Sequence, residues 1–484
     1  MWWFMRFGAA AAAAVGCVSS AGASPARAID GDAALADVAL MERVLTVLHP
    51  GYDRYTPRAE MDAAFDTLSD RVRGGTTDAE MFLEVSRVLE RIRCDHTKAE
   101  LPERLRAWRE ENASHLPVRV HIFGGRLYAG TNRVKGLDRG DEILSINGVP
   151  AGRLIEQTES LVSIDGWTEH ARSAEAELSG EYLGSGLDTF MPLIHGWSGS
   201  FEFVVVASGG AERVVTGDAI TYPAFVEMVR SGERAATDFA DAVSVERPDE
   251  RTAVLAVDTF INYRRPVDPE GVFGPIMRQL NEQGVEHLIV DLRANGGGST
   301  DAAFSLLRHL IAEPMPVSSG TLVRTVPIPQ DVKDAVTTWD RSALDATRDM
   351  FECDEATGLW RMLGEGSAVA TPADDRFRGR VTALSSRANA SGTTMLLAAL
   401  QQRAGVRIVG EPTGGSVEGP TAGVIAFCAL PASGVRVRVP LVRTDTGLEP
   451  GEPGMGVVPD VRVEVTAAGF FAGRDEVLEA ALGG

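Results

Sequence analysis

Ser391 is the residue of this chain whose surroundings best suit nucleophilic chemistry. A serine hydroxyl is a weak nucleophile, so it needs a base within reach and backbone N–H groups that face the developing oxyanion. Ser391 stands at the start of a predicted helix, and its neighbours Ala390 and Gly392 are small enough to let a peptide approach. The N–H of Gly392, aided by the helix N-terminus, is a natural oxyanion donor. The pattern favours acyl transfer at Ser391.

A second oxyanion donor is expected from the glycine turn Gly296-Gly297-Gly298. Glycine allows the backbone conformations that aim an N–H group at a ligand. We take Gly297 as the first choice within the turn. Removing one such donor typically lowers turnover by about 10²–10³.

The elements that must position these residues alternate between strand and helix after Arg247-Pro248. Apolar strands that alternate with helices indicate an α/β domain whose sheet is buried on at least one face. We therefore predict a catalytic α/β domain over residues 248–484. Its expected elements are the strands TAVLAVDTF, HLIVDLR, VTALSS and VRIVGE and the helices Phe273 to Gln283, Asp301 to Ile311 and Thr393 to Gln402.

The first half of the chain has a different texture. Apolar residues recur at helical spacing in MDAAFDTLSDRVR and AEMFLEVSRVLERIR, which predicts a helical region over residues 32–116. Residues 118–245 contain the short β-like runs VRVHIF, RLYAGT, EILSING and FEFVVVA and a helical stretch from Ile155 to Leu178. The fold class is therefore a multidomain mixture of α/β and α+β architecture.

Composition excludes several classes of function. The formal net charge of -21 argues against a nucleic-acid backbone or an anionic membrane surface as the main partner. The sequence has no G-x-x-x-x-G-K-S/T phosphate loop, no H-E-x-x-H and no G-x-S-x-G elbow. No C-x-x-C pair or histidine cluster has the spacing of metal ligands, so we expect neither a metal nor another cofactor.

The N-terminus resembles an export signal. One basic residue, Arg6, precedes an apolar run that is too short to span a bilayer. We expect residues 1–28 to contain the signal, with cleavage after Ala23 or Ala28, and a secreted, periplasmic or envelope location. Gly16-Cys17 also resembles the end of a lipoprotein signal, so a lipid anchor at Cys17 is an alternative.

Three separated segments together resemble the C-terminal processing and tricorn-type serine peptidases, and they follow in that family's order. They are RIRCDHTKAELPE, LIVDLRANGGG and ALSSRANASGTTMLLAALQQRAGVRIVGEPTGG. The resemblance implies a catalytic domain of the crotonase and Clp-like spiral kind and places the nucleophile at Ser391. It also places His96 in the family's Asp-x-His-Thr loop, as the general base.

The middle segment LDRGDEILSINGVPAGRL resembles part of a PDZ domain, with a turn at Gly140-Asp141 and an Asn-Gly hairpin at Asn147-Gly148. Such domains bind extended peptides by adding a strand to a sheet edge. An ordinary β-rich spacer with a hairpin is the alternative.

The chain departs from many relatives at the base. Where they carry a lysine it has Ser416, and no lysine follows Lys333. The resemblance then favours the tricorn-type arrangement, in which a histidine is the base and a glutamate orients it. In GLEPGEPGMGVVPDVRVEV the acid implied is Glu452, with Glu449 as the alternative.

These inferences predict a serine endopeptidase that hydrolyses unfolded polypeptides or C-terminal tails. The alternative is a non-catalytic ligand- or peptide-binding protein on the same fold. Beyond Cys17 the cysteines are Cys94, Cys353 and Cys428. A bridge between Cys353 and Cys428 is one option, and the sequence leaves the pairing open, as it does the oligomeric state.

Overall fold

The computed structural model describes residues 26–178, 184–207, 210–230, 236–355, 357–364 and 368–483. The predicted cleavage site after Ala23 and the candidate lipid attachment at Cys17 lie outside the described residues. Within these ranges no helix has the length and apolar character needed to cross a membrane.

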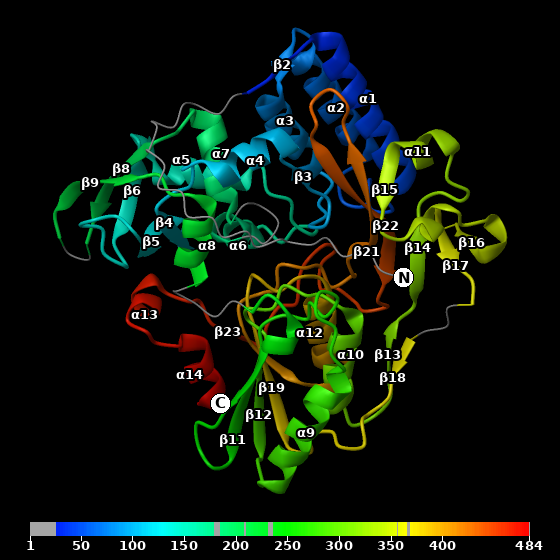
Figure 1. Cartoon of the computed structure of the whole chain (residues 1–484). Coiled ribbons are helices and arrows are strands. Elements are labelled where there is room, and N and C mark those ends of the chain that lie inside the picture. Colours follow the sequence, from blue (N-terminus) through cyan, green and yellow to red (C-terminus); the bar gives the residue numbers. More distant parts are fainter. Residues whose placement is uncertain are drawn as a thin grey trace.

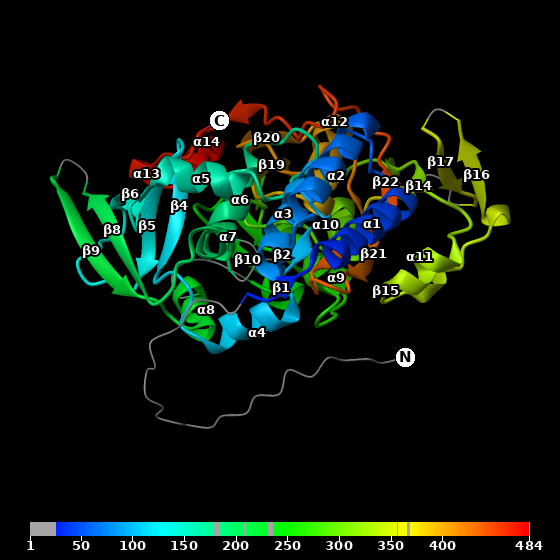
Figure 2. The same cartoon turned by 90° about the horizontal axis from the view of Figure 1, so that it is seen from above.

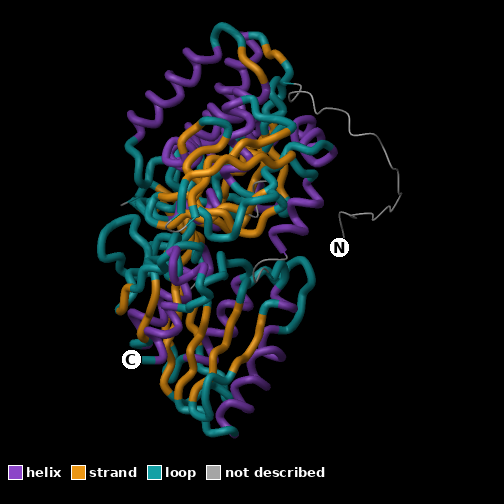
Figure 3. The backbone as a smooth tube through the Cα atoms, turned by 90° about the vertical axis from the view of Figure 1, so that its left-hand side faces the viewer, coloured by secondary structure: helices purple, strands orange, loops and turns teal. Residues whose placement is uncertain are grey.

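Four regions of the chain surround a common centre (Figure 1). Helices from the N-terminal region lie above a β-rich module on one side and a strand-rich region on the other, and a sheet flanked by helices lies below. Seen from above, the β8–β9 hairpin and the β16–β17 hairpin mark opposite ends of the molecule (Figure 2). The strands of the lower sheet run side by side with helices beside them (Figure 3).

The N-terminal region is helical, as predicted. Thr77 and Glu80 cap the third helix reciprocally, so the local sequence fixes where that helix begins. The helices bury apolar side chains such as Met41, Phe65 and Phe82 in one shared core. The helices are α1 (Gly31–Leu48), α2 (Arg58–Val72), α3 (Asp78–Glu90) and α4 (Glu103–Glu111), and a short ladder joins β1 (Ala28–Ile29) to β2 (Thr76–Thr77).

The β-rich module is an antiparallel sheet in the order β4-β5-β6-β8-β9, with β7 paired to β6. Asn147 and Gly148 both have positive φ, 48° and 76°, so the predicted Asn-Gly hairpin is present between β6 and β7. The strands are β4 (Val118–Phe123), β5 (Arg126–Asn132), β6 (Glu142–Ile146), β7 (Val149–Pro150), β8 (Ser200–Val206) and β9 (Glu212–Asp218). The helices are α5 (Ala151–Glu159), α6 (Ala171–Glu177), α7 (Gly186–His195) and α8 (Tyr222–Arg230).

The continuous helical stretch predicted from Ile155 to Leu178 is wrong. Helix α5 ends at Glu159 and α6 begins at Ala171, with an irregular loop between them. Gly166 in this loop has a φ of 56°, and Asp165 uses its side chain to accept a backbone N–H, as polar residues that interrupt helices do. We call residues 160–170 the linking loop, because it reaches both halves of the site described below.

The predicted α/β domain has a six-stranded sheet in the order β10-β11-β12-β19-β20-β23. All neighbours are parallel except β10, and each predicted strand and helix is found. The strands are β10 (Val243–Glu246), β11 (Thr252–Val257), β12 (His287–Asp291), β19 (Arg380–Ser385), β20 (Arg407–Gly410) and β23 (Val461–Arg462), and the helices are α9 (Pro269–Glu282), α10 (Thr300–Leu310), α12 (Ser391–Ala404), α13 (Ala467–Phe471) and α14 (Glu476–Leu482).

Both faces of this sheet are covered. Leu255, Val290 and Ala383 pack on one face in a core shared with α9, α10 and α12. Val254, Ile289 and Leu384 point to the other face and meet Val477 and Ala481 of α14. Alternate residues of each strand thus serve opposite cores, which explains their unbroken apolar sequences.

A further sheet, which the sequence did not predict, connects the regions. Its order is β15-β21-β22-β14-β17-β16, and β3 (Ala99–Glu100), which follows the His96 loop, pairs with β22. The strands are β14 (Gly320–Val323), β15 (Val336–Thr338), β16 (Phe351–Asp354), β17 (Leu359–Met362), β21 (Thr421–Ala429) and β22 (Arg436–Asp445), with α11 (Gln330–Ala335) beside them and β13 (Met315–Ser318) paired to β18 (Ala368–Ala370).

The three described cysteines are free thiols. Cys94 and Cys428 are buried, whereas Cys353 is exposed on β16. The bridge between Cys353 and Cys428 that the sequence left open is therefore absent among the described residues.

Candidate active site

Ser391 is the first residue of α12 and follows β19 through a loop of small and polar residues. Its φ is 49°, in the left-handed region that side-chain-bearing residues seldom adopt and that is found at strained functional positions. No side chain caps the helix at Ala390, and the first N–H groups of a helix have no acceptor within it. The N–H of Gly392 is therefore placed to meet an anion beside Ser391.

The glycine turn closes directly on the nucleophile. A Cβ atom built on Gly297 would lie 2.9 Å from Ser391 Cβ and 3.3 Å from Gly392 N. Gly297 has a φ of 112°, so any other residue here would be strained and would collide with Ser391. The structure thus brings Gly297, Gly392 and Ser391 together. The Gly297 N–H donates to Asn295 Oδ1 at 2.9 Å, so it would have to share its proton to serve an oxyanion.

Two buried asparagines hold the turn against the helix. Asn295 donates from Nδ2 to Val257 O at 3.0 Å and accepts from Thr393 Oγ1 at 2.8 Å. Asn389 donates from Nδ2 to Asn295 O at 2.9 Å and to Leu292 O at 2.6 Å. These bonds join β11, the end of β12 and α12, so the spacing between the glycine turn and Ser391 is fixed from several sides.

His96 lies in the loop between α3 and β3, and its side chain is half-buried. Its Nδ1 atom is buried and has no hydrogen-bond partner among the described residues. Its neighbour Lys98 is 3% exposed and forms ion pairs with Asp95 at 2.8 Å and Glu175 at 3.2 Å. The loop is thus anchored on both sides of His96, while the ring itself keeps a free nitrogen.

The linking loop connects the His96 loop to the nucleophile. Asp165 Oδ1 accepts the N–H of Asp95 at 2.8 Å, and Thr168 Oγ1 donates to Gly414 O at 2.7 Å. Gly415 N then donates to Asn389 O at 2.8 Å. No hydrogen bond joins His96 to Ser391 within the described ranges, so the structure relates the two residues through this relay of loops rather than by a direct contact.

Cys94, His96 and Asp165 form a compact cluster. One donor atom from each lies within 4.8 Å of the others. Ligands around a tetrahedral zinc ion are closer, about 3.3–3.8 Å apart for Zn–N and Zn–S bonds of ordinary length. Burial raises the pKa of the Cys94 thiol to about 12, and the nearby Asp165 carboxylate raises it further, which opposes the thiolate that a metal needs. The sequence missed this cluster because Asp165 is far from His96 in the chain.

Ser416, which stands where many relatives carry a lysine, is buried, and its Oγ donates to Glu418 Oε2 at 3.4 Å. Its Oγ lies 3.1 Å from Tyr55 Oη, and Tyr55 donates to Glu418 Oε2 at 2.8 Å. Glu418 also accepts the N–H of Gly454 at 2.8 Å. Burial, aided by Glu418, raises the pKa of Tyr55 far above its usual value, although Arg54 opposes this, so Tyr55 stays a neutral donor.

The candidate orienting acids lie on the turn that contains Gly454. Trp167 N donates to Gly454 O at 2.9 Å, so this turn lies against the linking loop. However, the side chains of Glu452 and Glu449 are exposed, and neither carboxylate makes a hydrogen bond or ion pair with a described residue. The structure does not join either acid to His96.

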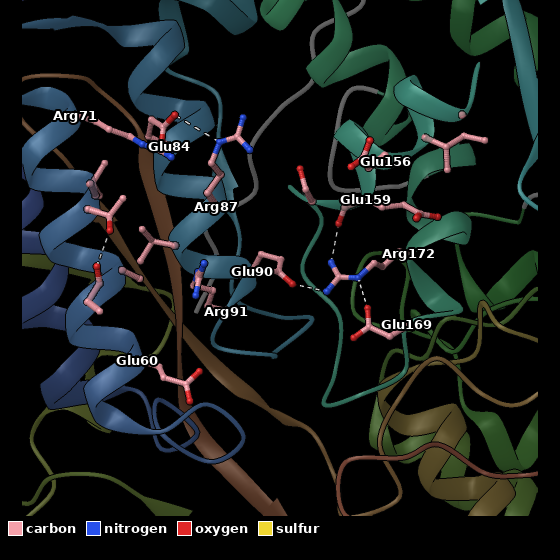
Figure 4. A pocket seen from close by; sticks show the side chains of 18 residues that line it. Glu60, Arg71, Glu84, Arg87, Glu90, Arg91, Glu156, Glu159, Glu169 and Arg172 are labelled. Atoms are coloured by element: carbon pink, nitrogen blue, oxygen red, sulfur yellow. Dashed lines mark hydrogen bonds and ion pairs between the residues drawn. The ribbon is translucent and has the colours of Figure 1, made fainter. Parts of the chain in front are cut away.

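A cavity of about 870 Å³ lies between α2, α3, α5 and the linking loop (Figure 4). Its walls are highly charged, and Arg172 at its edge bonds Glu90 of α3 and Glu169 of the linking loop. Ser391 and the glycine turn do not line it. This cavity is therefore separate from the nucleophile, and its ion pairs brace the linking loop.

Comparison with known proteins identifies the α/β domain. Residues 251–463 match peptidase family S41. No curated protein matches the chain. Mature CPAF complexed with lactacystin is 14% identical, covers 94% of this chain and 97% of its own, and gives a TM-score of 0.62.

Two further solved structures are similar. A serine-to-alanine mutant of CPAF is 14% identical over 91% of this chain and 94% of its own, with a TM-score of 0.65. The photosystem II D1 C-terminal processing protease is 16% identical over 89% of this chain and 93% of its own, with a TM-score of 0.40. At such identities the CPAF structures show a shared fold. Since residues 251–463 contain the glycine turn, Ser391 and the strands that hold them, the α/β domain belongs to peptidase family S41, and the chain is a serine-type peptidase.

Proposed function

We propose that the chain is an endopeptidase in which Ser391 attacks the carbonyl carbon of a peptide bond. The single observation that carries the proposal is the strained Ser391 backbone with Gly297 packed so closely against it that a Cβ atom on Gly297 would lie 2.9 Å from Ser391 Cβ. Such a geometry sets a hydroxyl beside the Gly392 N–H at the start of a helix, which is what acyl transfer requires.

In the proposed mechanism His96 takes the proton from the Ser391 hydroxyl and returns it to the leaving amine. The N–H groups of Gly392 and Gly297 stabilise the negative oxygen of the tetrahedral intermediate. Water then attacks the acyl-enzyme, His96 again acting as the base, and restores Ser391. The sequence-based candidate for the orienting acid, Glu452, stays a prediction.

The proposed substrates are unfolded polypeptides or C-terminal tails. The β-rich module supports this, because β9 is an edge strand of its sheet and Val214 on that strand is 61% exposed. An extended peptide can pair with such an edge, and unfolded polypeptides and C-terminal tails supply extended segments.

The test is labelling with a fluorophosphonate that reacts with activated serines, followed by digestion of an unfolded casein substrate read by mass spectrometry. We expect labelling at Ser391 and casein cleavage by the wild type, and neither in Ser391→Ala or His96→Ala. Ser342→Ala, which removes an exposed serine outside the site and the linking loop, should retain both. Because CPAF was solved with lactacystin, this compound is a second probe and should block labelling. Casein cleavage by Ser391→Ala would refute the proposal.

We also propose that the protein is exported and that cleavage follows Ala23 rather than Ala28. Arg27 supports the earlier site, because its N–H donates to Asp78 Oδ1 at 2.9 Å and its carbonyl accepts the Asp78 N–H at 3.0 Å. Cleavage after Ala28 would remove these bonds and half of β1. Lipid attachment at Cys17 remains the alternative, and mass spectrometry of the purified N-terminus distinguishes the three products.

A further inference from the structure

We propose that Asp165, rather than Glu452 or Glu449, is the positioning residue that orients His96 for proton transfer. The inference rests on the proposed function, since it assigns a partner to the base of that reaction. It concerns a carboxylate in the linking loop, 69 positions beyond His96 in the chain, that sequence patterns do not associate with catalysis.

Two unsatisfied atoms carry the inference. His96 Nδ1 and Asp165 Oδ2 are both buried, and neither has a hydrogen-bond partner among the described residues. A nitrogen of His96 and a carboxylate oxygen of Asp165 lie within 4.8 Å of each other. Leaving a buried donor or acceptor unpaired costs about 1–3 kcal/mol. One is a potential donor and the other an acceptor, so a closure that brings His96 Nδ1 to Asp165 Oδ2 would satisfy both.

The backbone is built to hold Asp165 in place beside the ring. Asp165 Oδ1 accepts the Asp95 N–H at 2.8 Å, Gly166 N donates to Arg93 O at 3.0 Å, and Ser163 Oγ donates to Thr97 O at 2.8 Å. These three bonds align the linking loop with the His96 loop residue by residue. Asp165 is thus fixed by one oxygen while the other remains for the imidazole.

Charged side chains brace the linking loop from outside. Arg172 donates to Glu159 O at 2.7 Å and Val162 O at 2.9 Å, and it also bonds Glu90 on α3 (Figure 4). Arg93 lies over the Trp167 ring, with 4.5 Å between its guanidinium carbon and the ring centroid. A positioning residue must itself be held rigidly, and this loop meets that requirement.

The electrostatic surroundings agree with a carboxylate that pairs with an imidazolium. The groups that face the pair are Asp95 and Cys94 on the His96 loop, and His49 and Arg54 beyond α1. Burial raises the pKa of Asp165 and the neighbouring Asp95 carboxylate raises it further, whereas His96 and Arg54 act in the opposite direction. A positive charge on the His96 ring therefore favours ionised Asp165.

In the reaction the proton on Nδ1 stays on the imidazole, hydrogen-bonded to Asp165. The other ring nitrogen is then unprotonated and accepts the Ser391 proton. Asp165 does not itself become protonated; it holds the tautomer and stabilises the imidazolium that forms. Glu452 and Glu449 are exposed and neither carboxylate bonds a described residue, whereas Asp165 is buried and lies in one cluster with His96.

The experiment compares Asp165→Asn with Glu452→Gln and Glu449→Gln in the full chain. Asp165→Asn keeps the acceptor for the Asp95 N–H but loses the charge. We expect its kcat on a fluorogenic peptide to fall by about 10³ or more with KM little changed, by analogy with the loss of a triad acid. The ascending limb of its pH–rate profile should move to lower pH, because a neutral amide no longer favours a protonated base. The two glutamine variants should keep wild-type rates within about threefold.

A second readout covers the case in which Asp165→Asn fails to fold. The wild type should show a strongly downfield imidazole N–H proton resonance that is lost in His96→Gln and retained in Glu452→Gln. Loss of activity and of this resonance in Glu452→Gln, with Asp165→Asn active, would overturn the inference and name Glu452 as the acid. Failure of fluorophosphonate to label Ser391 in the wild type would instead refute the proposed function, so the two failures are separable.

Discussion

The side chain of Asn295 holds the parts of the site together. Its side chain is fully buried and bonds β11, the glycine turn and α12 at once. The strained φ of Ser391 persists only because such contacts over-determine the backbone around it. Asn295 touches no substrate in the proposed mechanism, yet it sets where the oxyanion donors stand.

Replacing the Asn295 amide should therefore lower both the unfolding free energy and the turnover. We expect Asn295→Ala to lose about 1–3 kcal/mol of unfolding free energy, since it leaves Val257 O and Thr393 Oγ1 without their partner. Turnover should also fall by on the order of 10², the effect of losing one oxyanion donor. Denaturant unfolding and fluorogenic peptide assays measure the two effects.

The matched control is Asn281→Ala on α9. Asn281 also makes two side-chain bonds, to Arg376 O at 2.9 Å and from Arg378 N at 3.1 Å, but it is remote from Ser391. It should lose comparable stability and keep its turnover per folded molecule. Equal losses of turnover in both variants would mean that Asn295 acts only through stability.

The sequence predicts residues whose function depends on local neighbours. Small residues before a helix and a glycine turn after a strand are local patterns; they singled out Ser391, Gly392 and Gly297, which the structure brings together. Asp165 was not among the predicted residues, because its proposed role depends on a contact with the distant Asp95, made by a loop that apolar spacing assigned to a helix. The Asp165-Gly166 pair was the available signal, since such pairs mark turns.

At the element scale, the end of α1 supports the His96 loop through a buried histidine. His49 is the C-cap of α1; its Nδ1 accepts the Gly51 N–H at 3.0 Å and its Nε2 lies 2.7 Å from Thr97 Oγ1. Since Nδ1 is an acceptor, the proton must be on Nε2, and protonating the ring would set a donor against the Gly51 N–H. Burial, with Arg324 and His96 adding to it, lowers the pKa of His49 to about 3.

Stability should therefore fall in acid as this histidine is forced to ionise. The unfolded chain binds a proton near pH 6.5 whereas the folded chain does not until about pH 3, so the unfolded state holds more protons in this window. This term makes the unfolding free energy decrease by up to about 1.4 kcal/mol per pH unit below pH 6.5. Urea unfolding from pH 7 to pH 4.5 measures the slope.

The His49→Asn variant should lose stability at pH 7. Its unfolding free energy should depend less steeply on pH, by close to the contribution of one proton. His195→Asn is the control, because this ring is half-buried and bonds only Gln157 Oε1 at 2.9 Å. An unchanged slope in His49→Asn would show that another group accounts for the acid sensitivity.

The helices and parallel strands were predictable because each contains its own periodicity. Helices α2 and α3 have one apolar face, and β12 and β19 have unbroken apolar runs. The sheet built on β21 and β22 was not predictable in this way. Its strands pair with β3, β14 and β15 from distant segments, and its burial depends on those partners.

At the scale of the whole molecule, one ion pair joins the β-rich module to the loop before the nucleophile. Arg387, four residues before Ser391, donates to Glu177 Oε1 of α6 at 2.7 Å and to Ile122 O of β4 at 3.1 Å. The same Glu177 oxygen accepts the Ile122 N–H at 2.6 Å. Glu177 is 12% exposed and Arg387 20% exposed, so solvent screens this pair less than a surface pair.

This contact couples the β-rich module to the nucleophile. We expect a shift of β4 to displace Arg387 and, with it, the loop that ends at Ser391. We expect Glu177→Gln to reduce kcat/KM on the order of tenfold, within the 0.5–2 kcal/mol range of coupling through such contacts. Hydrogen exchange in residues 386–390 should become faster, whereas exchange in β12 should not change. Glu142→Gln is the matched control, since it breaks an exposed pair with Arg126 at 3.1 Å within the same module. If both variants behave like the wild type, the module does not communicate with Ser391 through this pair, and peptide binding at its sheet edge must act on catalysis by holding substrate alone.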